Sequence, residues 1–154
     1  MRAAPERSAD RDEALARALV HVPALGWGWR ALQAGLCEAG HPAGAARLEA
    51  ELLFPGGAID MVECFIDLAD REMVRIAAEP DFAARRTTGR VKALVLGRLA
   101  GLAPHREAVR RALGVLALPR HARVAAGSLA RNRPALPRNG WHPQPHPIAA
   151  AHRP

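Results

Sequence analysis

The apolar residues from 58 to 79 recur at every third or fourth position, and this period constrains the fold more than any other feature of the chain. Such spacing gathers apolar side chains on one face and predicts a long amphipathic helix. The run Phe54-Pro55-Gly56-Gly57 comes directly before it, and proline and glycine interrupt helices, so a preceding helix must end there. The predicted apolar face consists of Ile59, Val62, Phe65, Ile66, Ala69, Met73 and Ile76.

Five further segments of the chain have the spacing of a helix. We expect helices at residues 8–23, 27–40, 43–52, 87–102 and 104–118. Ser8 is a candidate N-cap for the first of them, which should end near Pro23. Aromatic residues make up only 4% of the 154 residues and tyrosine is absent, whereas β-sandwiches depend on aromatic and β-branched pairs. The sequence therefore predicts an all-α fold, and its length is that of one ordinary domain.

The net charge of +7 belongs almost entirely to one end of the chain. Residues 1–119 hold 16 of the 22 basic residues and all 15 acidic ones, a balance of +1, whereas residues 120–154 hold six arginines and no acid. This last segment also contains six prolines and four histidines, so we predict an irregular Arg/Pro-rich tail over 120–154 and a disordered N-terminus over 1–7. A GC-rich gene translated in a wrong frame gives this composition. A frameshift near residue 120 is our hypothesis, and the downstream DNA would test it.

Cysteine usage and apolar run lengths indicate where the protein works. Cys37 and Cys64 are too few for a disulfide framework and lie in apolar runs, which favours reduced, buried thiols and a cytosolic setting. The first ten residues lack the apolar region of a signal peptide. No stretch of about 18 apolar residues occurs, so we expect no spanning helix.

Catalytic motifs are missing from the sequence. The hydroxyl nucleophiles are Ser8, Thr87, Thr88 and Ser128, and no G-x-S-x-G motif occurs. No phosphate-binding glycine loop precedes the single lysine, Lys92, and the segment GWGWRA lacks the third glycine of the dinucleotide fingerprint. We therefore predict no catalytic residue and no cofactor.

Metal-binding and acid–base patterns are weak. Glu38 and His41 form one Glu-x-x-His pair without a second copy, so we expect no metal there and a helix-capping role for His41. Arginines alternate with the acids of the helix at 58–79, which favours a solvated face over acid–base work. These acids are Glu63, Asp67 and Asp70, and the tail histidines that suggest only adventitious metal binding are His142, His146 and His152.

The short N-terminal helices are typical of a helix-turn-helix, in which the helix at 43–52 would enter the major groove. We expect Trp27 and Trp29 to anchor the preceding helix in the core, and Trp141 lies in the tail. Residues 27–54 contain two arginines against three glutamates, although a DNA reader needs cations facing the phosphates. The charge predicts a helix-turn-helix shape without nucleic-acid binding.

Three segments carry a resemblance to a known family. ALVHVPALGWGWRALQAG, LFPGGAIDMVECFIDLADREM and LAPHREAVRRALGVLALP resemble, in order and spacing, the COQ-nine family, the lipid-binding accessory proteins of ubiquinone (coenzyme Q) biosynthesis. The resemblance covers residues 11–119. It implies a TetR-like helical bundle, with a helix-turn-helix-like part over 8–54 and the start of a lipid-binding part over 58–119. The break at Phe54–Gly57 then corresponds to the joint between the two parts.

The resemblance also implies a function. Proteins of that family perform no reaction; they enclose an isoprenoid lipid and present the ubiquinone precursor to a di-iron demethoxyubiquinone hydroxylase. The expected setting is the cytoplasmic side of the bacterial inner membrane, by peripheral contact, or the mitochondrial matrix side in a eukaryote, with a homodimer as in the family. On the apolar stripes of the helices at 58–79, 87–102 and 104–118, our candidate lipid-binding residues are Val62, Phe65, Ile66, Leu94, Val95, Leu99, Val109 and Leu113.

The chain departs from the family after residue 119. The family continues with helices that carry the hydroxylase-binding surface, much of the dimer interface and a membrane-touching helix, and none is recognisable here. We therefore expect a truncated bundle with the inner faces of its last two helices exposed, prone to self-association or loose packing. Two alternatives stay open: a TetR-type DNA-binding regulator, and binding of acidic membranes or RNA by the tail arginines alone.

Overall fold

The computed structural model describes residues 7–121 and 126, and within that part of the chain every regular element is helical. The all-α prediction is thereby confirmed. The elements are α1 (Ala9–Leu19), α2 (Val22–Leu25), α3 (Trp29–Glu38), α4 (Ala43–Leu53), α5 (Ala58–Ala77), α6 (Thr87–Leu102), the 3₁₀ turn η1 (Ala103–His105), α7 (Arg106–Leu116) and the 3₁₀ turn η2 (Pro119–His121).

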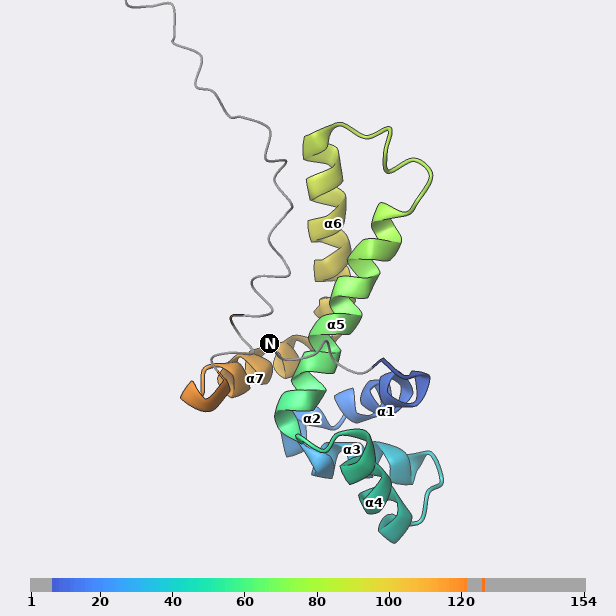
Figure 1. Cartoon of the computed structure of the whole chain (residues 1–154), viewed down its shortest axis with the longest axis vertical. Helices are drawn as coiled ribbons and strands as arrows, with labels where there is room; N and C mark the ends of the chain where they lie inside the picture. The colour runs from blue at the N-terminus through green and yellow to red at the C-terminus, as the bar shows by residue number, and fades with distance from the viewer. Residues whose placement is uncertain (1–6, 122–125, 127–154) are drawn as a thin grey trace, which may run out of the picture.

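The helices form two groups that share α5. Helices α1 to α4 lie together at one end of the molecule, and α5 runs from them to the far end, where the chain turns and returns as α6 (Figure 1). Helix α7 then lies across the base of this hairpin, where it contacts α2 and α5. The hairpin of α5 and α6 therefore projects from a body built by α1 to α4 and α7.

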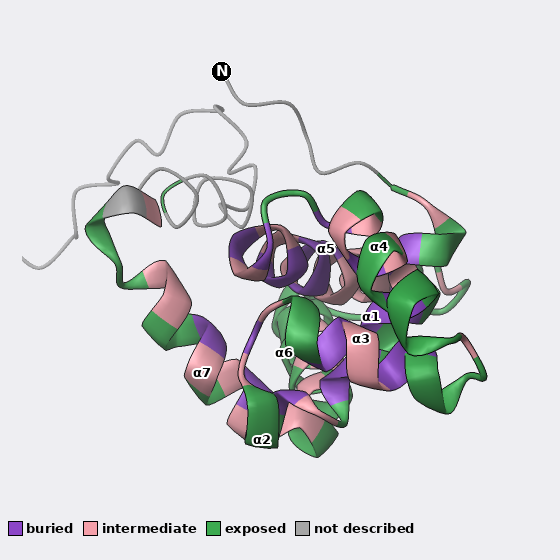
Figure 2. Cartoon of the chain, turned by 90° about the horizontal axis from the view of Figure 1, so that it is seen from below, coloured by how far each residue is buried: buried purple, intermediate pink, exposed green. Residues whose placement is uncertain are grey.

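Most buried side chains lie where α1, α3 and α5 meet (Figure 2). Leu15, Leu32 and Met61 have no exposed surface and come from these three helices. The predicted stripe of α5 is confirmed, because its members are buried or half-buried as far as Ile76. The core thus follows the helical period of the sequence.

The predicted break between α4 and α5 is confirmed and has a clear geometry. Gly57 has a φ of 63°, a left-handed conformation that side chains other than glycine adopt with strain. The backbone N–H of Gly56 donates to a carboxylate oxygen of Asp60 at 2.6 Å, which ties the glycine turn to the first turn of α5. Phe54 is fully buried, and the Arg11 guanidinium lies 4.4 Å from the centre of its ring. Phe54 thus anchors the joint to α1.

Several sequence predictions in the N-terminal half need correction. The first helix ends at Leu19 and the chain restarts as α2, because Pro23 in the first turn of α2 needs no hydrogen-bond partner for its nitrogen. Ser8 has the N-cap position of α1, but its side chain makes no capping hydrogen bond. Cys37 is exposed, and only Cys64 is buried as predicted. Trp27 is buried in the core, whereas Trp29 is 41% exposed.

Some predictions fall on residues that the structure does not describe. They are the disorder of residues 1–6, almost all of the tail over 120–154, and the tail residues Trp141, His142, His146 and His152. Arg7, which we placed in the N-terminus, is described, and its guanidinium lies 2.7 Å from a carboxylate oxygen of Asp67 in α5.

Candidate functional site

Helix α6 is the least covered helix of the described chain. None of its sixteen residues is buried, although it has an apolar stripe. Val91, Val95, Leu96 and Leu99 are each at least half exposed. One side of α6 packs on α5, where Gly97 allows close approach to Ile76, and no other helix among residues 7–121 covers its opposite side. Exposed apolar residues that adjoin one another in this way mark binding surfaces in soluble proteins.

An apolar groove follows α6 onto α7. Its volume is about 540 Å³, within the range of small-molecule sites, and Arg106 at the start of α7 is its one charged lining residue. The remaining lining residues are Leu96, Leu99, Ala100, Leu102, Ala103 and Val109. The proline-containing turn η1 redirects the chain between the two helices, so that Val109 of α7 adjoins the leucines of α6.

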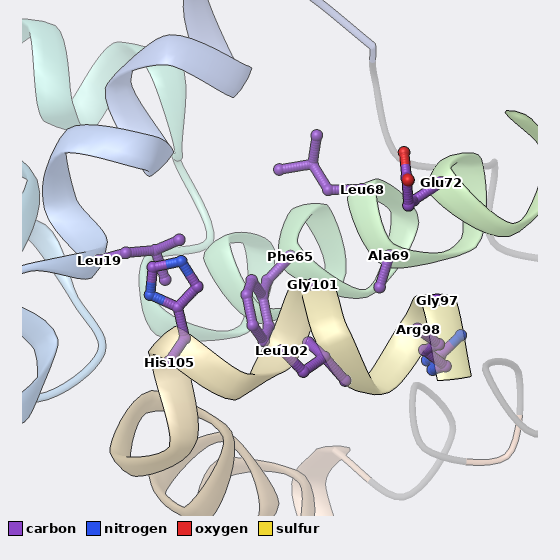
Figure 3. Close-up of a pocket in the computed structure, with 10 residues that line it drawn as sticks. All are labelled: Leu19, Phe65, Leu68, Ala69, Glu72, Gly97, Arg98, Gly101, Leu102 and His105. Carbon is purple, nitrogen blue, oxygen red and sulfur yellow. The ribbon is translucent and has the colours of Figure 1, made fainter. Parts of the chain in front are cut away.

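A second pocket lies on the other side of α6, against α5 (Figure 3). Its volume is about 190 Å³. The rings of Phe65 and His105 meet edge to face there, with centroids 6.3 Å apart. The other lining residues are Leu19, Leu68, Ala69, Glu72, Gly97, Arg98, Gly101 and Leu102. Leu102 therefore borders both the groove and this pocket.

The eight predicted lipid-binding residues lie in three different environments. Leu99 and Val109 line the groove, and Phe65 lines the pocket. Val62 has no exposed surface and belongs to the core, against which Ile66 packs. The other three lie outside both hollows: Leu94 is half-buried, whereas Val95 and Leu113 are half or more exposed.

The sequence prediction missed Leu96, Leu102 and His105 as site residues. Leu102 follows Leu99 by three positions, so the helical period could have identified it. Leu96 directly follows Val95, and it borders the groove together with Val109 of α7. His105 faces Phe65 across forty residues of sequence, and no local pattern reports such a contact.

Three carboxylates of α5, those of Asp67, Asp70 and Glu72, are paired with arginines. Asp67 is buried, which contradicts the predicted solvated face, and it binds the guanidinium groups of Arg7 and Arg71. Asp70 accepts a hydrogen bond from Arg98 of α6 at 2.6 Å. Burial of Asp67 is possible because two cations neutralise it. These acids tie the N-terminal segment and α6 to α5.

The pair of Asp12 and Arg71 links α1 to α5 and should make stability depend on pH. Two hydrogen bonds of 2.7 and 2.8 Å from Arg71 lower the pKa of Asp12 below its ordinary value of 3.8. A depressed carboxyl pKa stabilises the fold above the unfolded pKa and is lost as the pH falls through the folded one. We expect Asp12→Asn to cost about 1 kcal/mol at pH 7, since both partners are partly exposed, and almost nothing at pH 2.

Urea denaturation of the wild type and of Asp12→Asn at pH 7, 5, 3 and 2 measures this effect. The difference in the free energy of unfolding should be constant from pH 7 to 5 and shrink below that. Glu13→Gln is the control, because Glu13 pairs with Arg17 on the exposed side of the same helix. A difference for Asp12→Asn that persists unchanged at pH 2 would contradict the pairing.

Within residues 7–121, the thiol and imidazole groups form no cluster that could hold a metal ion. Burial raises the pKa of Cys64 to about 11, and its thiol donates to Asp12 at 3.7 Å. The ring of His41 lies 2.8 Å from Glu49 across the turn between α3 and α4, so its backbone N–H rather than its side chain caps α3. No group of three metal-binding side chains occurs among residues 7–121.

Helix α4 exposes apolar and acidic side chains. On α4, Leu48 and Leu52 are 60% and 73% exposed. Arg47 donates to Glu51 one turn later, which neutralises a cation that could otherwise contact a phosphate. This helix therefore lacks the free cations that bind a DNA backbone.

No described helix is both long and apolar enough to cross a bilayer. Comparisons with protein-family models, curated proteins and solved structures find no match to this chain.

Proposed function

We propose that this protein is a non-enzymatic accessory protein of ubiquinone biosynthesis. It binds a prenylated quinone precursor and presents it to the demethoxyubiquinone hydroxylase at a membrane surface, to which it binds peripherally as a homodimer. The family assignment within the all-α class is supported by the three motif segments over residues 11–119. The apolar groove along α6 and α7 is the observation that supports a prenylated ligand.

The shape of the groove suits a long hydrocarbon chain. The groove is open to solvent and is lined by leucines. Further exposed apolar side chains of α6 extend this apolar surface toward Val95 and Val91. Each methylene that leaves water there contributes about 0.8 kcal/mol, so even a few isoprene units give useful affinity. An open groove also leaves one side of the bound hydrocarbon accessible. A protein that passes its ligand to an enzyme requires such access.

Two matched substitutions test the groove. Leu99 lines it and is 57% exposed, whereas Leu48 on α4 is 60% exposed and lies in the other half of the molecule. Leu99→Asp should weaken the binding of a polyprenyl quinone at least about tenfold, because it places a carboxylate against the hydrocarbon. Leu48→Asp should bind like the wild type. Titration of each purified full-length protein with the quinone, and mass spectrometry of co-purified lipid, give the measurement.

The same proteins test presentation to the enzyme. Wild type and Leu48→Asp should raise the turnover of purified hydroxylase on its prenylated substrate, and Leu99→Asp should not. The proposal fails if no polyprenyl lipid binds the wild type, or if both aspartate variants bind it equally.

A further inference from the structure

The pocket between α5 and α6 has the size of one six-membered ring. An enclosed apolar cavity of about 150 Å³ in another protein admits benzene, and this pocket has about 190 Å³. Gly101 contributes to the space, because a Cβ atom placed there would have no neighbour within 4 Å. Phe65 supplies an aromatic wall, and Leu68 and Leu102 supply aliphatic ones. Planar rings pack well against such walls.

One polar side chain of the pocket, His105, has no hydrogen-bond partner among residues 7–121. The ring nitrogens of His105 make no hydrogen bond within the described part of the chain, whereas its ring is held against Phe65. An imidazole can donate through one nitrogen and accept through the other. His105 can therefore hydrogen-bond either a carbonyl or methoxy oxygen or a phenolic hydroxyl.

The charged residues at the opposite end of the pocket are already neutralised. Figure 3 shows His105 beside Leu19 at one end and Arg98 beside Gly97 at the other. Arg98 donates to Asp70 at 2.6 Å, and Glu72 accepts two hydrogen bonds from Arg75. Because the charges of Arg98 and Glu72 are each balanced by a partner, the pocket favours a neutral ring.

We propose that this pocket binds the head of the ligand: a neutral, oxygen-substituted six-membered ring, phenol or quinone, hydrogen-bonded to His105. Leu102 borders both hollows, so a chain attached to such a ring can pass around it into the groove. The inference rests on the proposed function, because it takes ring and chain as parts of one molecule. Helix α6 then contacts the ring of the ligand on one side and its hydrocarbon chain on the other.

Small probes separate the ring site from the chain site. In saturation-transfer NMR and calorimetric titrations of the full chain, 4-methylphenol should bind about fivefold more tightly than toluene, the value of one net hydrogen bond. His105→Phe should abolish that difference while still binding both rings. Gly101→Leu fills the pocket and should abolish binding of both. Gly114→Leu is the matched control, since a Cβ there also meets nothing, Gly114 lines neither hollow, and binding should be unchanged.

Each result bears on one of the two proposals. The ring site is refuted if Gly101→Leu binds 4-methylphenol like the wild type, or if the wild type does not distinguish it from toluene. Geranylgeraniol has a chain and no ring; if it still binds while the ring site fails, the groove stands. If Gly101→Leu does not fold, nuclear Overhauser effects between 4-methylphenol and the Phe65 ring in the wild type decide, and their absence overturns the proposal.

Discussion

Replacing Trp27 with alanine should lower the free energy of unfolding by about 4 kcal/mol, much of the stability of an ordinary domain. Trp27 is buried, its ring lies 5.4 Å from that of Phe65 in α5, and its indole N–H donates to the carbonyl of Ala108 in α7 at 2.9 Å. One side chain thus holds the segment between α2 and α3 against both later helices. Its removal opens a large cavity and releases α7.

Urea denaturation followed by far-UV circular dichroism measures the loss, and Trp29→Ala is the control. Trp29 is 41% exposed and makes one hydrogen bond, to the carbonyl of Phe54, so we expect about half the cost. A Trp27→Ala protein that is no less stable than Trp29→Ala would contradict the packing of α7. A helix content near that of the wild type at low urea would show that the variant still folds.

Gly35→Ala should destabilise the protein by about 2 kcal/mol, although alanine favours helices. A Cβ atom at Gly35 would lie 2.8 Å from the backbone carbon of Arg17 and 3.0 Å from the nitrogen of Ala18. These are backbone atoms of α1, so only a separation of α1 and α3 can relieve the clash. Such overpacking costs about 3 kcal/mol, and the higher helix propensity of alanine returns about 1 kcal/mol.

The same substitution at Gly114 in α7 gives the opposite expectation. No atom lies within 4 Å of a Cβ there, so Gly114→Ala should stabilise the protein by up to about 1 kcal/mol. Thermal and urea denaturation of both variants, compared with the wild type, provide the test. Equal effects at the two glycines would mean that α1 and α3 are not in backbone contact.

Sequence reasoning predicted the helices well because each is specified locally. The period from Ile59 to Ile76 and the glycines before it determine α5 and its start, and both are confirmed. It failed where a side chain's environment depends on segments far away. Asp67 looked solvated among arginines of its own helix, yet Arg7, sixty residues earlier, covers it. Cys37 looked buried in an apolar run, yet it lies on an exposed part of α3.

The candidate site was predictable only in part, for the same reason. The apolar stripes located Leu99 and Val109, because both lie on faces that the period defines. The division into a groove and a pocket depends on how α7 crosses the hairpin, and on Gly101 leaving space. A period reports which residues are apolar neighbours on one helix, and it does not report whether another helix covers them.

The lack of any buried residue in α6 has an energetic consequence for this half of the molecule. Detaching α6 uncovers less apolar surface than detaching α1 or α3, whose side chains form the core, so its opening requires less free energy than unfolding of those helices. The amide protons of α6 then exchange with solvent through brief local openings, whereas those of the N-terminal helices exchange only on global unfolding. A hydrocarbon bound to α6 would slow that exchange, because it would cover the apolar side chains of α6 as the packed interior of a protein does.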